Sequence, residues 1–406
     1  RAWLASPCNV VSFCAEGATS GSHVSRISPL VLTSFVISRF RCYARPMSEF
    51  VLSAATGIRT RIDYAKELNQ EQLEVVLHGD GACLVLAGAG SGKTRTLTYR
   101  VAYLLERGVD PSSILLLTFT NKASREMIDR VRGLLGSDAT GIWGGTFHSI
   151  GSRILRSFAD YLGYTPSFSI MDAEDSGDLL KALIKELGID TKTKRFPSTS
   201  VVQDCISYAR NVQAPIVEAL TQKYPHFQDA APRIEEIAAL YQARKKAGNM
   251  MDFDDLLALL ALLLEDPHHG PAIASRFAYV LVDEFQDTNA LQARIVKGFA
   301  QVHKQVLVVG DDAQSIYAFR GADVQNILSF PKQWPEARMF KLLTNYRSTP
   351  QILEVANASL KHNQDQFEKD LIAMGSAGEK PRLVPCQSAS QEARYVADQV
   401  GALRTK

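Results

Sequence analysis

Short apolar runs that end in glycine or polar residues mark the strands of a predicted sheet. The first three cover residues 84–87, 114–117 and 279–282. Continuous apolar runs of this length, closed by turn signals, indicate strands that are buried on both faces, as in a parallel sheet. Residues 68–117 as a whole predict helix, strand, glycine-rich loop, helix and strand, with Pro111 opening the turn before the second strand. This order is a βαβ unit.

Residues from about 152 to 265 predict helix almost throughout, without a strand signal. Asp178–Leu187 has apolar residues spaced by three and four and stops at Gly188, and Ile234–Lys246 repeats that spacing. The longest apolar run, Leu256–Leu264, is shorter than the roughly 18 residues that a membrane helix needs, so we expect a buried helix and no membrane contact. An all-helical stretch between two strands indicates an inserted subdomain.

The strand pattern returns after the helical stretch. Strands are expected at Tyr279–Asp283, Gln305–Gly310 and Arg338–Thr344, with a helix following the last of these. Pro381–Pro385 resembles the start of another strand. The expected fold class is therefore α/β, with a parallel sheet and an inserted all-helical subdomain.

The glycine-rich loop after the first strand carries the most informative chemistry. It reads Ala87-Gly88-Ala89-Gly90-Ser91-Gly92-Lys93-Thr94, with Ala87 where the strict pattern has its first glycine. Glycines let backbone N–H groups close around phosphates, the lysine reaches the β- and γ-phosphates, and the threonine hydroxyl can ligate Mg²⁺. The loop therefore predicts a site for a nucleoside triphosphate.

A pair of acids completes the predicted site. The apolar run 279–282 ends in Asp283 and Glu284, and ligands bind where the carboxyl ends of parallel strands meet. We expect Asp283 to hold Mg²⁺ through water and Glu284 to polarise the attacking water as general base. With the loop, these residues predict a Mg²⁺-dependent nucleoside triphosphatase; a strand capped by solvated acids is the alternative.

Composition narrows the classes of partner and compartment. The 406 residues suffice for two or three domains, and 46% hydrophobic with 22% charged residues is typical of a globular protein. The net charge is only +2, so nucleic-acid binding would have to come from a local groove. The six cysteines form no CxxC pair, so we expect neither a metal cluster nor a disulfide framework, which fits a reducing compartment.

Residues 1–46 differ from the rest of the chain. They are rich in serine and hold five arginines against the single acid Glu16, which is typical of an organellar transit peptide. The alternative, which we favour, is that Met47 is the true start, because the chain begins at Arg1 and not at a methionine.

A series of blocks between residue 68 and about residue 400 resembles, in order and spacing, the superfamily 1 DNA helicases of the UvrD, Rep and PcrA type. Besides the loop and the acid pair, the matching blocks are 68–72, 118–123, 145–149, 310–321 and 345–349. The resemblance implies RecA-like motor domains and an ATP-dependent helicase that moves 3′ to 5′ on single-stranded DNA. A cytoplasmic, nucleoid-associated protein of bacterial type, acting in repair or replication, is then expected.

The resemblance also implies roles around the nucleotide. Gln72 would read the adenine edge with Arg95 beside it, and Tyr346 would stack on adenine. Gln314 would sense the γ-phosphate or its attacking water, and Arg347 would reach the γ-phosphate from across the cleft. The alternatives are a surface glutamine for Gln72 and a surface ion pair for Arg347.

In the same family, three of the blocks line a groove for single-stranded DNA. Aromatic faces there would stack on bases, at about 1–3 kcal/mol per base. Phe319 stands where many members have tryptophan, which weakens stacking. The alternatives are core positions for Phe119 and Phe147 and a satisfied buried polar group for His148. The expected DNA contacts are Phe119, Asn121, Thr146, His148, Tyr317, Phe319 and Arg320.

The resemblance divides the chain into five parts. An N-terminal extension, disordered or not translated, would cover 1–66. The first motor domain would cover 67–165 and 251–340, with the helical subdomain 166–250 inserted, and 341–406 would begin the second motor domain.

Two further blocks of the family do not occur before Lys406, so we expect a fragment that does not unwind DNA by itself. Expected partners are ATP, Mg²⁺, single-stranded DNA, 3′-tailed duplex DNA and repair or replication proteins. Two other functions stay open: the helicase portion of a RecB-like helicase-nuclease, and a nucleotide-dependent DNA-binding module without motor activity. Met251–Asp255 resembles one more block, but its acids begin a predicted helix and receive no catalytic role.

Overall fold

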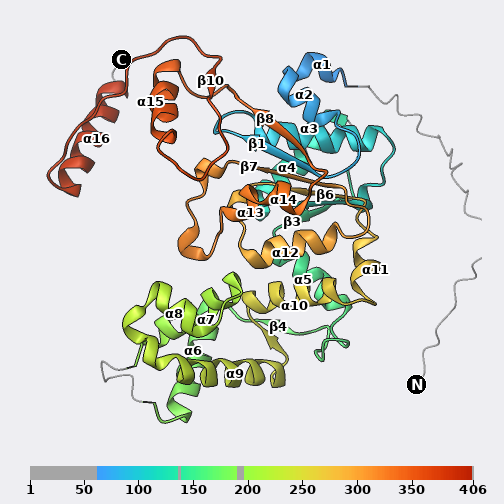
Figure 1. Cartoon of the computed structure of the whole chain (residues 1–406), viewed down its shortest axis with the longest axis vertical. Helices are drawn as coiled ribbons and strands as arrows, with labels where there is room; N and C mark the ends of the chain where they lie inside the picture. The colour runs from blue at the N-terminus through green and yellow to red at the C-terminus, as the bar shows by residue number, and fades with distance from the viewer. Residues whose placement is uncertain (1–61, 136–138, 190–195, 405–406) are drawn as a thin grey trace, which may run out of the picture. The chain divides into compact units, whose positions relative to one another are not determined.

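The computed structural model describes residues 62–135, 139–189 and 196–404. Its centre is a six-stranded sheet in the order β3-β2-β6-β7-β1-β8, in which every ladder is parallel (Figure 1). The expected α/β class with a parallel sheet is therefore confirmed. The transit-peptide and Met47 interpretations concern 1–46, which lie outside the described residues. The strands are β1 (Cys83–Ala87), β2 (Ile114–Leu117), β3 (Trp143–Gly145), β6 (Tyr279–Val282), β7 (Val306–Gly310) and β8 (Arg338–Leu342).

Helices cover both faces of this sheet because alternate residues of each strand point to opposite sides. On β1, Leu84 and Leu86 join one apolar core, while Cys83 and Val85 join the other. The first core is covered by α5 (Phe147–Ser157), α10 (Phe253–Glu265) and α12 (Ala290–Phe299). The second is covered by α2 (Gln70–Val76), α3 (Lys93–Glu106) and α4 (Asn121–Leu135).

The run Leu256–Leu264 forms most of α10 and is largely buried, as the sequence predicts. No helix in the described part of the chain combines the length and the apolarity that crossing a bilayer requires.

The inserted helical subdomain has a core of its own. Its main helices are α6 (Ala173–Glu186), α7 (Thr199–Val212), α8 (Ile216–Lys223) and α9 (Ala231–Ala247). Two short strands, β4 (Ser169–Ile170) and β5 (Met250–Met251), pair in parallel where the chain enters and leaves it. The sequence predicts no strand here, because two residues are too few to show an alternating pattern.

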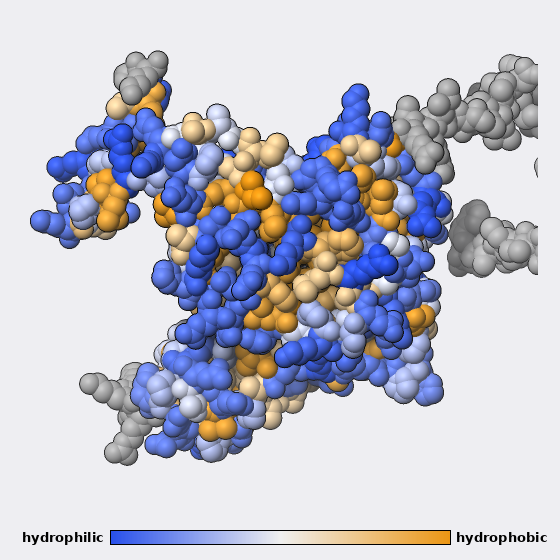
Figure 2. Space-filling model, turned by 45° about the horizontal axis from the view of Figure 1, so that its top comes forward, coloured by the Kyte–Doolittle hydropathy of each residue, from blue (hydrophilic) through white to orange (hydrophobic). Residues whose placement is uncertain are grey.

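The last part of the chain leaves the large sheet at Leu343. The strand expected over Arg338–Thr344 is split into β8 and the short β9, which pairs with β10 instead. Pro381–Pro385 is not a strand, and Leu383 is 95% exposed. Proline lacks the backbone N–H that a ladder needs, so this prediction is wrong for a physical reason. The helix α16 has no buried residue, and Figure 2 shows exposed apolar side chains on the surface among polar ones.

The remaining elements are short or peripheral. They are α1 (Tyr64–Glu67), α11 (Gly270–Ala274), α13 (Gln325–Leu328), α14 (Phe330–Gln333), β9 (Thr344–Asn345), α15 (Pro350–Leu360), β10 (Ile372–Ala373) and α16 (Ala389–Arg404), with 3₁₀ turns at Pro111–Ser113, Pro225–Ala230, Phe285–Asp287, Asp312–Gln314 and Ala318–Arg320.

Candidate functional site

The glycine-rich loop joins β1 to α3 and depends on its glycines. Gly90 and Gly92 have φ angles of +75° and +88°, in the left-handed region that favours glycine. A Cβ on Gly92 would lie 2.6 Å from the Gln72 side-chain nitrogen, and one on Gly90 would lie 2.6 Å from the Arg347 Cβ. The loop is therefore closely surrounded, and side chains at these two positions would displace its neighbours.

Lys93 and the acids after β6 meet beside this loop. Lys93 Nζ lies 2.8 Å from Glu284 Oε2. Glu284 has a left-handed backbone, with φ of +50°, which is uncommon for a residue other than glycine. The sheet edge thus brings together Lys93 and Glu284, which are 191 residues apart in the sequence. These are the residues predicted to bind phosphate and to act as general base.

Three carboxyls crowd this edge. Burial, followed by the negative charge of Glu284, raises the pKa of Asp283 to about 6. The same two causes raise the pKa of Asp287 to about 6. Asp287 Oδ1 is buried and has no hydrogen-bond partner. The crowded acids would be relieved by a cation, and oxygen donors of this kind suit Mg²⁺.

The protein donors fit Mg²⁺ only if water and the phosphates of a nucleotide supply further ligands. Thr94, half-buried at the start of α3, follows Lys93 directly. Within the described residues no three acidic, histidine or cysteine side chains close into a metal site. Mg²⁺ typically keeps several waters and binds one or two carboxylates together with substrate phosphates. Thr94 and Asp283 therefore fit a metal that arrives with its nucleotide.

Hydrogen bonds continue from Glu284 to the block after β7. Gln286 Nε2 donates to Glu284 Oε2 and to Asp287 Oδ2, at 3.0 Å each, and Gln286 Oε1 accepts from the Asp311 N–H at 3.0 Å. Gln314 Nε2 in turn donates to Asp311 Oδ2 at 2.5 Å. Gln314 is therefore joined to Glu284 through Asp311 and Gln286 and does not contact Glu284 directly in this series of hydrogen bonds. Sequence reasoning missed Gln286, although it stands two residues after Glu284.

A buried lysine holds the same block from the other side. Lys369 Nζ lies 2.9 Å from Asp311 Oδ1 and also pairs with Asp312, and its side chain is only 2% exposed. Sequence reasoning missed this residue too. It stands in an irregular segment, where no pattern signals burial.

The segment after β9 lies directly on the loop. Asn345 Nδ2 donates to the Ala89 carbonyl at 2.5 Å, and the Tyr346 N–H donates to the Gly90 carbonyl at 2.9 Å. The Tyr346 hydroxyl accepts from Asn69 Nδ2 at 2.8 Å. Arg347 is exposed next to Gly90. The predicted contact of Tyr346 and Arg347 with the nucleotide requires both residues to lie this close to the glycine-rich loop.

Gln72 and Arg95 lie on the other side of the loop. Gln72 is 2% exposed and its Nε2 donates to the Ser91 carbonyl at 3.0 Å, so the surface alternative for Gln72 is wrong. The Arg95 guanidinium pairs with Glu67 at 3.1 Å and lies 4.7 Å from the centre of the Tyr99 ring. Both predicted adenine neighbours therefore border the loop.

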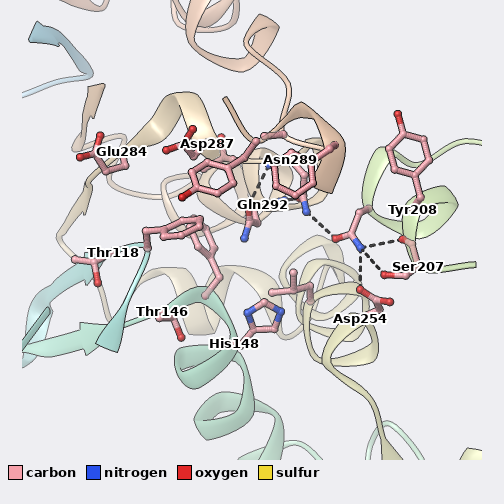
Figure 3. Close-up of a pocket in the computed structure, with 18 of the residues that line it drawn as sticks. Thr118, Thr146, His148, Ser207, Tyr208, Asp254, Glu284, Asp287, Asn289 and Gln292 are labelled. Atoms are coloured by element: carbon pink, nitrogen blue, oxygen red, sulfur yellow. Dashed lines mark hydrogen bonds between the residues drawn. The ribbon is translucent and has the colours of Figure 1, made fainter. Parts of the chain in front are cut away.

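A cavity of about 600 Å³ opens beside the acids (Figure 3). Glu284 and Asp287 line one end of it. The ring centres of Phe119 and Tyr317 are 5.2 Å apart, and those of Tyr317 and Phe319 are 5.9 Å apart. Of the seven expected DNA contacts, those that line the cavity are Phe119, Thr146, His148, Tyr317 and Phe319.

The other expected DNA residues differ in placement. Asn121 does not line the cavity, but its Oδ1 accepts from the Thr146 N–H at 3.3 Å. The side chain of Arg320 lies outside what the structure describes. Phe119 is exposed, so its core alternative is wrong, whereas Phe147 is buried in the core. Burial lowers the pKa of His148, whose ring lines the cavity.

The opposite wall of the cavity comes from the inserted subdomain. Ser207, Tyr208 and Asn211 of α7 and Lys223 of α8 face it. The Lys223 ammonium lies 4.8 Å from the centre of the Tyr208 ring. Sequence reasoning missed these residues, because nothing in an amphipathic helix tells which polar position faces a neighbouring domain.

Comparisons with known proteins agree with this geometry. Residues 68–335 match the family described as UvrD/REP helicase N-terminal domain, and residues 340–406 match the UvrD-like helicase C-terminal domain. The chain is 40% identical over 337 residues to the ATP-dependent DNA helicase PcrA of Staphylococcus epidermidis, covering 82% of this chain and 45% of that protein. It is 40% identical over 331 residues to PcrA of Staphylococcus aureus, covering 81% and 44%. The chain thus spans less than half the length of these curated relatives.

Proposed function

Since the chain belongs to the UvrD/Rep helicase family, we propose that it forms the ATP-hydrolysing and single-strand-binding core of a helicase that moves 3′ to 5′. One observation carries the proposal: the short segment after β6 serves two sites at once. Its Glu284 pairs with the loop lysine, and both Glu284 and Asp287 line the aromatic cavity. A change at the bound nucleotide would therefore occur next to the cavity that is proposed to bind DNA.

In the proposed reaction, Lys93 leaves Glu284 and binds the β- and γ-phosphates, because phosphate carries more negative charge than a carboxylate. Thr94 and Asp283 would hold Mg²⁺, which would supply positive charge against the phosphates. Glu284, released from its lysine, orients and polarises the attacking water.

The segment after β9 would close the site around the nucleotide. Tyr346 stacks on adenine, Gln72 and Arg95 border it, and Arg347 approaches the γ-phosphate from the side of Gly90. Gln314 reports hydrolysis through Asp311 and Gln286, the two residues whose hydrogen bonds join it to Glu284.

Single-stranded DNA would lie in the aromatic cavity, with bases stacked on Phe119, Tyr317 and Phe319. Part of the proposal is the division of the chain into a motor domain (67–165 and 251–340), an inserted subdomain (166–250) and the start of a second motor domain (341–406). The proposal also includes roles in repair or replication, with 3′-tailed duplex DNA as substrate.

The test is ATP hydrolysis by the full-length product of this gene, with and without oligodeoxythymidylate. We expect Mg²⁺-dependent hydrolysis that single-stranded DNA stimulates several-fold. Tight binding of both ligands without hydrolysis would favour a DNA-binding module without motor activity. Degradation of the DNA during the assay would favour the RecB-like helicase-nuclease.

A further inference from the structure

The side chain of Asn211 joins three elements in the wall of the cavity. Asn211 belongs to α7 of the inserted subdomain, and its Nδ2 donates to Asp254 Oδ1, near the start of α10, at 2.8 Å. Its Oδ1 accepts from Asn289 Nδ2, at the start of α12, at 2.6 Å. Figure 3 draws the bonds that reach Asn289 and Asp254 as dashed lines. We propose that Asn211 is a positioning residue that transmits the state of the nucleotide site to the DNA-facing cavity, an inference that rests on the proposed function.

The nucleotide end of this connection is Asn289. It stands two residues after Asp287 and is buried. Its Oδ1 accepts from the Gln292 N–H at 2.8 Å and thereby caps α12, so its Nδ2 is directed at Asn211. Because Asn289 continues the segment that carries Glu284, a movement of that segment on nucleotide binding is passed to Asn211.

The DNA end is the segment that follows Phe319. Asn289 forms an isolated antiparallel bridge with Ala322. A Cβ on Gly321 would lie 3.3 Å from Val212 Cγ1 and 3.6 Å from Asn211 Cβ, so this segment packs against α7. Asn211 therefore touches both the continuation of the acidic segment and the continuation of the aromatic segment.

The amide of asparagine suits this position because it donates and accepts at once. Alanine loses the bonds to Asp254 and Asn289, and the Nδ2 donor of the buried Asn289 is left without this acceptor. Aspartate keeps an acceptor for Asn289 but sets a second carboxylate against Asp254. Burial already raises the pKa of Asp254, so added negative charge is poorly tolerated there.

A second bridge lets the variants be tested in a folded protein. Arg294 of α12 contacts Gln213 at the end of α7 and Glu265 of α10, the latter at 2.6 Å. This bridge does not involve Asn211, so it keeps the subdomain against α12 in Asn211→Ala.

The experiment measures how a nucleotide changes DNA affinity in the full-length gene product. The probe is fluorescein-labelled oligodeoxythymidylate of about 16 nucleotides, titrated with and without a non-hydrolysable ATP analogue and Mg²⁺. For the unaltered chain we expect the analogue to shift the DNA Kd by at least about fivefold. In Asn211→Ala and Asn211→Asp we expect a shift below about twofold, while the Kd of the analogue without DNA stays unchanged.

Gln203→Ala is the matched control. Gln203 lies on the same helix, but its Nε2 donates to the Ala173 carbonyl at 2.9 Å inside the subdomain. We expect this variant to keep the full shift.

The outcomes separate the two claims. If Asn211→Ala keeps the full shift, or if the unaltered chain binds both ligands without a shift, the role of Asn211 is refuted while the proposed binding sites stand. Lost analogue binding or a lower melting temperature in Asn211→Ala, absent from Gln203→Ala, would show a structural role only and also refute the proposal. An unaltered chain that binds neither ligand would refute the proposed function, and this inference with it.

Discussion

At the scale of single residues, the proposed nucleotide binding would break the 2.8 Å pair between Lys93 and Glu284. Lys93→Ala removes the cation that would meet the phosphates, so we expect loss of ATP hydrolysis. Glu284→Gln keeps the size of the side chain and removes the base, so we expect retained Mg²⁺·ATP binding with turnover lowered by about 100-fold or more. Fluorescent-nucleotide titration and phosphate release, measured on the full-length gene product, separate the two. Equal turnover in the unaltered protein and Glu284→Gln would show that Glu284 is not the base.

If Asp283 holds Mg²⁺ as proposed, metal binding depends on pH. Its pKa of about 6 lies above the ordinary value of 3.8, so between pH 4 and 6 the folded chain binds a proton that the unfolded chain has lost. The contribution of Asp283 to stability without nucleotide therefore rises as the pH falls from 6 to 4. Mg²⁺ needs the carboxylate, so we expect Mg²⁺·nucleotide affinity to fall by up to about tenfold per pH unit below 6.

The measurement for Asp283 is nucleotide affinity at several pH values between 7.5 and 5, in the unaltered chain and in Asp283→Asn. The variant is the control, because it retains the titration of the nucleotide itself. Parallel pH profiles for the two proteins would contradict a role for this carboxyl.

At the scale of elements, the segment after β7 should bind DNA through one of its two exposed apolar side chains. Phe319 is 64% exposed and lines the cavity, whereas Ile316, in the same segment, is 72% exposed and does not line it. We expect Phe319→Ala to weaken oligodeoxythymidylate binding by about 1–3 kcal/mol and Ile316→Ala to leave it unchanged. Fluorescence anisotropy measures both affinities. Unchanged DNA affinity with a much lower melting temperature in Phe319→Ala would show that the ring serves the core instead.

Lys369 should stabilise the contact between the irregular segment before β10 and the end of β7. Removing it in Lys369→Met leaves Asp311 and Asp312 buried without their cation, which costs about 3–5 kcal/mol. Lys361 is the matched control, since its pair with Asp370 is 3.8 Å long and both side chains are about 70% exposed. We expect no measurable loss in Lys361→Met. Urea unfolding compares them, and an equal effect would contradict the structural role of Lys369.

How far the sequence predicts an element depends on the strength of its pattern. Apolar runs such as Tyr279–Asp283 and Leu256–Leu264 coincide with β6 and α10 within a few residues, because burial on both faces imposes a continuous signal. The strands β4, β5 and β9 are too short for a pattern, and Pro381–Pro385 misleads because apolar residues between prolines have no ladder to join. In the site, residues of glycine-rich and acidic motifs were predictable, whereas Asn211 and Lys369 depend on how separate elements pack.

At the scale of the whole molecule, the described chain ends in a segment that contributes little to either sheet core. All described residues of α16 are exposed, and the chain spans 45% of the length of a curated relative. Exposed apolar surface of this kind favours association. We therefore expect the 406-residue chain to aggregate more readily than the full-length gene product, to bind ATP weakly, and not to unwind DNA.

The most direct test of the proposed function is strand displacement by the full-length gene product on duplexes with either a 3′ or a 5′ single-stranded tail. We expect unwinding of the 3′-tailed duplex that requires ATP and Mg²⁺ and is lost in Lys93→Ala. The 406-residue chain in the same assay should displace no strand. Unwinding that prefers the 5′ tail, or that persists in Lys93→Ala, would contradict a 3′ to 5′ motor driven from this nucleotide site, and robust unwinding by the 406-residue chain would contradict the assignment of its last part.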